Sequence, residues 1–169
     1  GGNFRVILID QKDYFEYTPG VLRLFCAPKC FGRVAGVLPR DESSHELIQG
    51  RVTSIVDGQK QKVVSYVHQS QTKTLPYDYL ILATGSTYNY PITASGNELS
   101  WKDRKLGWEA AHRRLASASK VLILGGGAVG VELAAEIVDH FPQKQVTLVD
   151  ASPTLVPLFP KSVGEYAAR

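Results

Sequence analysis

The feature that most constrains the fold is a glycine-rich stretch, residues 125–130 with the sequence GGGAVG, set between an apolar run and a helical pattern. Residues 121–124 are all apolar, as expected of a buried strand, and residues 129–141 have the periodicity of an amphipathic helix. A further stretch, VTLV at residues 146–149, is expected to be another buried strand and is followed by Asp150. A strand, turn, helix and strand within about 30 residues predict a βαβ unit with parallel strands.

The glycine spacing G-x-G-x-x-G is typical of a turn that binds the phosphates of a dinucleotide, provided that a strand precedes it and a helix follows. Gly125 permits a tight exit from the strand, Gly127 lets the backbone approach a pyrophosphate, and Gly130 brings helix and strand close together. The first helical turn, with Ala128 and Val129, points free N–H groups and the positive end of the helix dipole at the phosphates. These residues predict a nicotinamide dinucleotide site.

Two acidic residues accompany the turn. Asp150 lies twenty residues after Gly130 at the end of the next strand, where a carboxylate can accept hydrogen bonds from a ribose diol. A carboxylate repels a 2′-phosphate, so the sequence favours NADH over NADPH. Glu132, in the first helical turns, is either an acid stabilised by the helix dipole or a residue that faces the nicotinamide, and the sequence leaves both open.

The first half of the chain predicts a second α/β region. Residues 4–9 form a nearly continuous apolar run ending in Asp10, as in a buried parallel strand. Residues 45–56 and 61–67 predict two strands joined at Asp57-Gly58, which is a strong hairpin signal.

A third strand is expected over residues 74–84, where the pattern changes from alternating to fully apolar. It ends in the small residues Ala83, Thr84 and Gly85, across which a large flat ligand can lie at the carboxyl end of the strand.

We therefore expect an α/β protein with two Rossmann-like three-layer domains, both incomplete, and a small β-meander. Residues 1–86 would form a partial FAD-binding domain, with the meander at about 45–75. Residues 87–101, rich in Ser, Thr, Asn, Pro and Gly, would be a crossover linker. Residues 102–169 would form a partial NAD(P)H-binding domain, with helices expected over 102–118 and from 161 onward.

Composition excludes several other classes. With 44% hydrophobic and 21% charged residues the chain is typical of a soluble globular protein, and no apolar run is long enough for a transmembrane segment. The basic residues between 102 and 120 lack aromatic interleaving, so we interpret them as a solvated helix face and expect no nucleic-acid partner. Cys26 and Cys30 have neither a redox nor a zinc spacing, which favours two free thiols and no metal site.

Three stretches, VILIDQKDYFEYTPGVLR, YDYLILATGS and VLILGGGAVGVELAAEI, resemble the FAD/NAD(P)-binding pyridine nucleotide-disulphide oxidoreductase superfamily. Within it the nearest likeness is to apoptosis-inducing factor 2-like (ferroptosis suppressor) proteins and to type II NADH:quinone reductases. The resemblance implies FAD and NAD(P)H as cofactors. It also implies that the first FAD-binding strand, with its own glycine fingerprint, is not in this sequence, so we expect a piece of a longer protein that holds FAD poorly.

The resemblance assigns individual positions. Asp10 would bind the adenosine ribose of FAD, and Lys12 and Val52 would contact the adenosine end. The strand end would meet the flavin dinucleotide through Ala83, Thr84 and Gly85.

Other positions lie near the two reacting rings in this family. Pro19 and Arg23 match a stretch near the isoalloxazine, and Glu132 would lie beside the nicotinamide. Ala128 stands where several disulphide reductases carry an aromatic lid. For the aromatic residues at 14, 15 and 17 we favour core packing over flavin stacking.

The function implied is transfer of a hydride from NADH to FAD and then of electrons to an acceptor, for which we favour a quinone. The cofactors carry this chemistry, so no catalytic side chain is assigned. Two alternatives stay open: a disulphide- or ferredoxin-type reductase of the same superfamily, and a redox-signalling module that binds NAD(H) without turnover. We further expect an intracellular protein, cytoplasmic or mitochondrial, with peripheral membrane attachment left open, and a homodimer formed through exposed strand edges.

Overall fold

The computed structural model describes residues 4–39, 41–42 and 45–168. Contacts within the chain group it into two compact units. The first unit contains Gly1–Phe15 and Ala35–Arg104, and the second contains Glu16–Val34 and Lys105–Arg169. The α/β class expected from the sequence is confirmed, whereas the domain boundaries at residues 86 and 102 stay a prediction.

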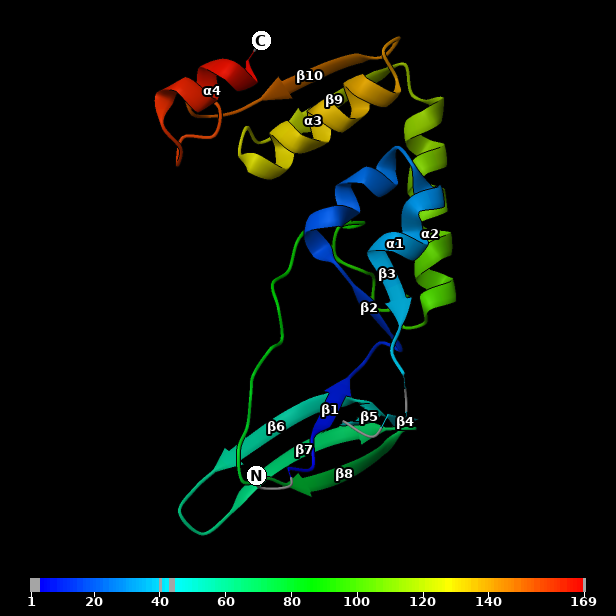
Figure 1. Ribbon diagram of the computed structural model, residues 1–169, viewed down its shortest axis with the longest axis vertical. Coiled ribbons are helices and arrows are strands. Elements are labelled where there is room, and N and C mark those ends of the chain that lie inside the picture. Colours follow the sequence, from blue (N-terminus) through cyan, green and yellow to red (C-terminus); the bar gives the residue numbers. More distant parts are fainter. Residues whose placement is uncertain (1–3, 40, 43–44, 169) are drawn as a thin grey trace. The chain divides into compact units, whose positions relative to one another are not determined.

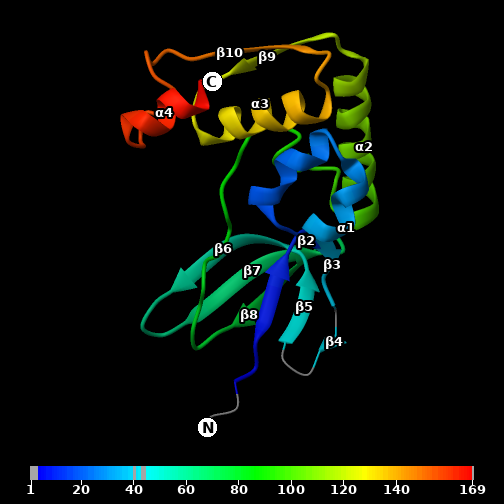
Figure 2. The ribbon, with the colours of Figure 1, turned by 45° about the horizontal axis from the view of Figure 1, so that its top comes forward.

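In the first unit the strand that ends in Asp10 lies at one edge of a small mixed sheet of three strands. Strand β1 (Ile7–Asp10) pairs in parallel with β5 (His45–Gln49), and β4 (Asp41–Glu42) pairs antiparallel with β5 (Figure 2). The register places Asp10 opposite Gln49. The end of the apolar run thus forms a parallel strand, as predicted, but the expected burial is wrong, because Phe4, Val6 and Leu8 are 78%, 52% and 40% exposed.

A three-stranded antiparallel meander follows, made of β6 (Arg51–Asp57), β7 (Lys62–His68) and β8 (Gln71–Pro76) (Figure 1). The hairpin at Asp57-Gly58 is confirmed. The expected meander start at residue 45 is wrong, because residues 45–49 belong to the sheet with β1. The chain changes sheets at Gly50, where a β-carbon would lie 3.0 Å from the backbone oxygen of Val67, so a larger residue would require that strand to shift.

The expected buried strand over residues 74–84 is wrong beyond Pro76. Residues 78–88 lie outside any helix or strand, and Tyr79 and Ile81 are 84% and 87% exposed. A fully apolar strand is stable when neighbouring strands and covering helices bury both of its faces. The part of the chain that the structure describes supplies no strand that pairs with these residues.

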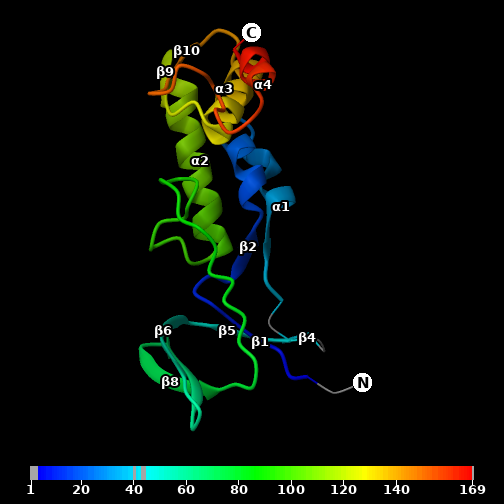
Figure 3. The ribbon, with the colours of Figure 1, turned by 90° about the vertical axis from the view of Figure 1, so that its left-hand side faces the viewer.

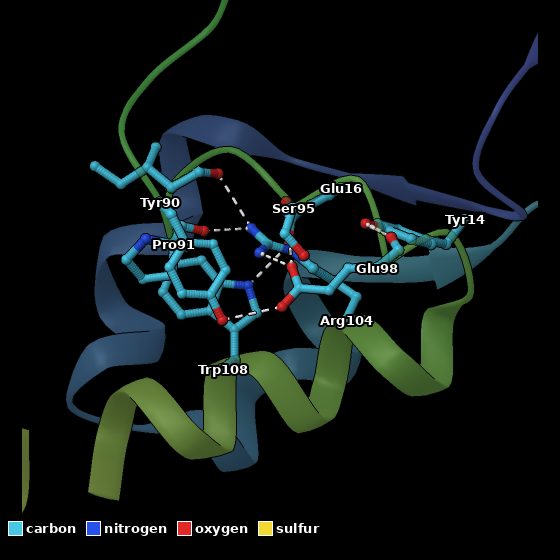
Figure 4. Close-up of polar contacts among 9 residues, drawn as sticks. Tyr14, Glu16, Tyr90, Pro91, Ser95, Glu98, Arg104 and Trp108 are labelled. Carbon is cyan, nitrogen blue, oxygen red and sulfur yellow. Dashed lines mark hydrogen bonds and ion pairs between the residues drawn. The ribbon is translucent and has the colours of Figure 1, made fainter. Parts of the chain in front are cut away.

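The crossover region ends in a buried polar cluster. Helix α2 (Trp101–Ser117), close to the predicted bounds, carries Arg104 in its first turns. The guanidinium of Arg104 donates to Glu98 Oε2 at 2.9 Å and to the backbone oxygens of Pro91 and Ile92 at 2.7 and 3.1 Å (Figure 4). The hydroxyl of Tyr90 donates to Glu98 Oε1 at 3.0 Å. These bonds hold the loop before α2 against the start of the helix.

The second unit begins with short helical turns. They are η1 (Thr18–Phe25), η2 (Pro28–Cys30) and α1 (Phe31–Val34). Trp108 of α2 is fully buried, donates its indole N–H to Glu16 at 2.9 Å and meets the Phe25 ring edge-on at 5.3 Å. His112 bonds the backbone oxygen of Phe25 at 2.9 Å, so these turns are tied to the middle of α2.

The predicted βαβ unit is present in the second unit. It consists of β9 (Lys120–Leu124), α3 (Ala128–His140) and β10 (Gln145–Val149), and β9 and β10 are parallel (Figure 3). Helix α4 (Lys161–Ala167) follows, as expected, and residue 169 lies outside the described residues.

The core of this unit forms where α3 covers one face of the two strands. Ile123, Ile137 and Cys26 are its buried centre, and partly buried side chains pack around them: Phe25, Leu115, Val121, Leu133, Ala134, Phe141, Val146 and Leu148. The predicted apolar stripe of the helix therefore faces the sheet. The expectation that residues 121–124 form a buried strand is wrong for one face, because Leu122 and Leu124, on the face that α3 leaves open, are 62% and 77% exposed.

The aromatic residues near the N-terminus behave differently from one another. Tyr14 is 1% exposed and donates its hydroxyl to the backbone oxygen of Glu98 at 2.9 Å. Phe15 and Tyr17 are 58% and 56% exposed, so core packing is wrong for these two. Strand β2 (Tyr14–Glu16) pairs with β3 (Ala35–Val37). Because successive side chains of a strand point to opposite faces, Tyr14 is buried while the next residue, Phe15, is exposed.

Within the described residues, no helix has the length and apolarity of a membrane span.

Candidate functional site

The glycine-rich turn lies between β9 and α3. Gly125 adopts φ +114°, a left-handed conformation that side chains other than glycine rarely adopt. Gly127 is the N-cap of α3, and a β-carbon there would meet nothing within 4 Å. A β-carbon on Gly130 would collide with the carbonyl oxygen of Gly125. Strand and helix therefore approach so closely that only glycine fits at position 130.

The start of α3 is open to solvent. Gly127, Ala128 and Val129 are exposed, and Glu132 is exposed one turn further on. The first backbone N–H groups of a helix have no partner within the helix and carry its positive dipole end. This end of α3 can therefore accept an anion. The role of Glu132 beside the nicotinamide, which the resemblance implies, stays a prediction.

Asp150 lies at the end of β10, beside the turn. Its Oδ2 accepts a hydrogen bond from the backbone N–H of Gly126 at 2.5 Å, and its Oδ1 accepts one from the N–H of Ser152 at 2.6 Å. These two bonds hold the pKa of the Asp150 carboxyl below its ordinary value. The carboxylate is therefore ionised at neutral pH and is oriented by these two backbone N–H groups.

Sequence reasoning did not single out Gly126, Leu155 or Val156. The N–H of Val156 donates to the carbonyl oxygen of Gly126 at 2.7 Å, and Leu155 packs against Gly126. The extra glycine at 126, between the fingerprint glycines at 125 and 127, was the one signal in the sequence for this contact.

The adenosine-side residues assigned by resemblance lie in the first unit. Asp10 ends β1, its Oδ1 accepts the N–H of Lys12 at 2.9 Å, and its backbone oxygen accepts the N–H of Gly50 at 2.8 Å. The ammonium of Lys12 lies 5.2 Å from the centre of the Tyr14 ring. Val52 lies in β6, one residue after the strand begins, and is 41% exposed. The structure thus places Asp10 and Lys12 at one strand end.

The strand end that was expected to meet the flavin is not formed. Ala83, Thr84 and Gly85 are exposed and lie outside any strand, and Gly85 has φ +72°. Their predicted role depends on a strand that the described residues do not complete.

Arg23, expected near the isoalloxazine, forms an ion pair in the second unit. Its Nη2 and Nε lie 3.0 and 3.1 Å from Glu136 Oε1 on α3. The hydrogen bond and the charge of Glu136 raise the pKa of Arg23. Pro19 occupies the first turn of η1, where its missing N–H costs nothing.

The two cysteines are free thiols, as predicted. Cys26 is buried in the core beside Ile123 and Ile137, and burial raises its pKa to about 11. A thiol of this kind is a poor nucleophile because the thiolate is the reactive form.

Comparison with known proteins supplies the family. The family model described as pyridine nucleotide-disulphide oxidoreductase matches residues 3–169. Ferroptosis suppressor protein 1 of Xenopus tropicalis is 34% identical over 158 residues, which are 92% of this chain and 40% of that protein. The human protein of the same name is 32% identical over 177 residues, covering 99% of this chain and 44% of that protein. The chain therefore spans about two fifths of the length of these relatives.

Solved structures show the same fold at lower identity. NDH2 from Plasmodium falciparum in complex with RYL-552 superimposes with a TM-score of 0.67 at 19% identity, covering 96% of this chain and 40% of that one. The water-forming NADH oxidase from Lactobacillus brevis, bound to NADH, has a TM-score of 0.66 at 19% identity, covering 97% of this chain and 38% of that one.

Proposed function

Because the chain belongs to the pyridine nucleotide-disulphide oxidoreductase family, we propose that residues 125–130 and Asp150 bind NADH within an FAD-dependent oxidoreductase. One observation carries this proposal: an oriented, ionised Asp150 lies beside a turn in which Gly130 leaves no space for a side chain. A phosphate-binding turn next to a ribose-binding carboxylate is the combination that a dinucleotide requires.

The residues of the turn have distinct tasks. The backbone N–H groups at the start of α3 hold the pyrophosphate, and the absence of side chains at Gly125 and Gly127 lets it approach. Asp150 accepts the ribose hydroxyls and repels a 2′-phosphate, which favours NADH over NADPH. When bound, the nicotinamide supplies a hydride and the flavin accepts it and passes the electrons on.

For FAD, Asp10 would bind the adenosine ribose, with Lys12 and Val52 beside the adenine. Ala83, Thr84 and Gly85 would contact the flavin dinucleotide once their strand has neighbours. The sequence contains a single G-x-G-x-x-G turn, which belongs to the NADH site, so the groups that would neutralise the FAD pyrophosphate are not among these residues. We therefore expect this chain by itself to bind FAD weakly.

For the acceptor we propose a quinone. Within this chain Cys26, with its buried thiol and raised pKa, is unsuited to a dithiol relay. The remaining support is the resemblance to quinone reductases. A reductase for ferredoxin and a module that binds NAD(H) without turnover are the other outcomes of the test.

The test has two parts. The chain is titrated with NADH, and micromolar binding that is lost in Asp150→Ala supports the nucleotide site. The full-length protein, supplied with FAD, is then assayed with a ubiquinone analogue, a disulphide and a ferredoxin. Quinone turnover supports the proposed acceptor, preference for either other substrate overturns it, and NADH binding without flavin reduction supports the signalling alternative.

We also propose that the chain self-associates. The two-stranded sheet of β9 and β10 has two edges without a neighbouring strand among the described residues, and Leu122, Leu124 and Val149 are exposed on its open face. Such edges and apolar faces are prone to pair with a second copy. Light scattering should give a dimer that Leu124→Glu dissociates, and a wild-type monomer at high concentration would exclude it.

A further inference from the structure

Gly126 is the point at which the glycine-rich turn and the segment after β10 are joined. Its N–H donates to Asp150 Oδ2 at 2.5 Å, and its carbonyl oxygen accepts the N–H of Val156 at 2.7 Å. The backbone N–H and the carbonyl oxygen of Gly126 are thus both bonded to residues 150–156, the segment that begins with Asp150. None of the three glycines of the G-x-G-x-x-G pattern makes this contact.

The contact leaves no space for a side chain. Gly126 is buried, and a β-carbon on it would lie 2.7 Å from Leu155 Cδ2 and 3.0 Å from Asp150 Cβ. Its backbone is not in the left-handed region, so an alanine could adopt the conformation and would act by its size alone. Leu155 or Asp150 would have to move.

The segment is also held from its other side. Val156 is buried with φ +44°, an unfavourable conformation for a β-branched residue that persists when the surroundings impose it. A β-carbon on Gly164 of α4 would lie 2.6 Å from the backbone oxygen of Leu155, so α4 packs directly on this segment. The backbone of Leu155 is therefore held by α4, so a β-carbon at position 126 would displace the tip of the Leu155 side chain and the β-carbon of Asp150, which lies 3.0 Å away.

We propose that Gly126 is a positioning residue that fixes the orientation of the Asp150 carboxylate and thereby sets the preference for NADH over NADPH. This inference rests on the proposed function of the site. The N–H of Gly126 occupies one lone pair of Oδ2 and the N–H of Ser152 one of Oδ1, which leaves further lone pairs for two ribose hydroxyls. A carboxylate held in one orientation would bind the ribose at a smaller entropic cost, and its fixed charge would repel a 2′-phosphate.

The test compares NADH and NADPH dissociation constants, measured by fluorescence titration, for the wild type and three variants. Gly126→Ala should weaken NADH binding about tenfold while NADPH binding changes less than about twofold, since one charge-assisted hydrogen bond is disturbed. Gly126→Ala with Leu155→Ala removes the nearest clash and should recover part of the discrimination. Gly32→Ala, whose β-carbon would meet nothing within 4 Å, is the matched control and should behave as the wild type.

Each outcome decides the matter. Equal weakening of both nucleotides, or an unchanged ratio, overturns the role of Gly126 while leaving the nucleotide site in place. A wild type that binds neither nucleotide overturns the proposed function and this inference with it. Should Gly126→Ala fail to fold, amide exchange at Gly126 serves instead: it should be slow in the wild type and faster in Asp150→Ala, and equal rates overturn the proposal.

Discussion

The guanidinium of Arg104, which is fully buried, donates a 2.9 Å hydrogen bond to the carboxylate of Glu98, itself only 7% exposed. The remaining polar atoms of the pair are taken up by backbone groups of the preceding loop and by the hydroxyl of Tyr90 (Figure 4). A buried ion pair with satisfied neighbours adds little net stability but is costly to break from one side.

Replacement of Arg104 by alanine should therefore destabilise the protein by about 3–5 kcal/mol, because Glu98 would be left as an uncompensated buried charge. Arg113→Ala, at an exposed position of the same helix, should change the free energy of unfolding by less than about 0.5 kcal/mol. Urea unfolding followed by circular dichroism measures both. Equal effects of the two substitutions would contradict the interpretation.

Ile137 should be the residue of α3 whose truncation is costly. It is 1% exposed at the centre of the core of the second unit, so Ile137→Ala should cost about 2–5 kcal/mol through lost burial and the cavity left behind. The neighbouring Val138 is 54% exposed, and Val138→Ala should cost well under about 1 kcal/mol. Thermal unfolding measures both variants. A similar loss of stability in the two would contradict the position of Ile137 at the centre of the core.

Cys26 should resist alkylation in the folded protein. Burial raises the pKa of its thiol to about 11, so at pH 8 only about one molecule in a thousand carries the reactive thiolate. Iodoacetamide followed by mass spectrometry should label Cys30, which is only half-buried, well before Cys26, and both equally in urea. Rapid labelling of Cys26 under native conditions, or a disulphide between Cys26 and Cys30, would show that the Cys26 thiol is not buried as described.

The contribution of Asp150 to stability should disappear in acid. The hydrogen bonds from Gly126 and Ser152 lower the pKa of its carboxyl in the folded state. The stabilisation is therefore fully present above the unfolded pKa, about 3.9, and is lost as the pH falls through the lower folded value. Asp150→Asn should be less stable than the wild type at pH 7, and the difference should shrink below about pH 4. A difference that stays constant across this range would show that the carboxylate charge is not involved.

The local pattern of apolar residues was enough to predict the strands and the helix of the βαβ unit in the second half of the chain. The apolar run at 121–124, the stripe of residues 129–141 and the run at 146–149 predicted β9, α3 and β10, because the βαβ unit is built from contacts between neighbours in sequence. Local pattern was not enough for residues 78–84, since an apolar run becomes a buried strand when other segments cover it. The same limit explains why Leu122 and Leu124 are exposed in a strand of the expected length and place.

The sequence by itself determined the α/β class and the glycine turn with Asp150 at the next strand end, because spacing along the chain carries these features, and the resemblance of three stretches indicated the family. Only the tertiary structure decided that Arg104 and Glu98 are buried partners, that Arg23 pairs with Glu136, and that Gly126 holds Asp150. Each of these is a contact between side chains or backbone groups that folding brings together. No local periodicity encodes such a contact, so it becomes visible when the chain has packed.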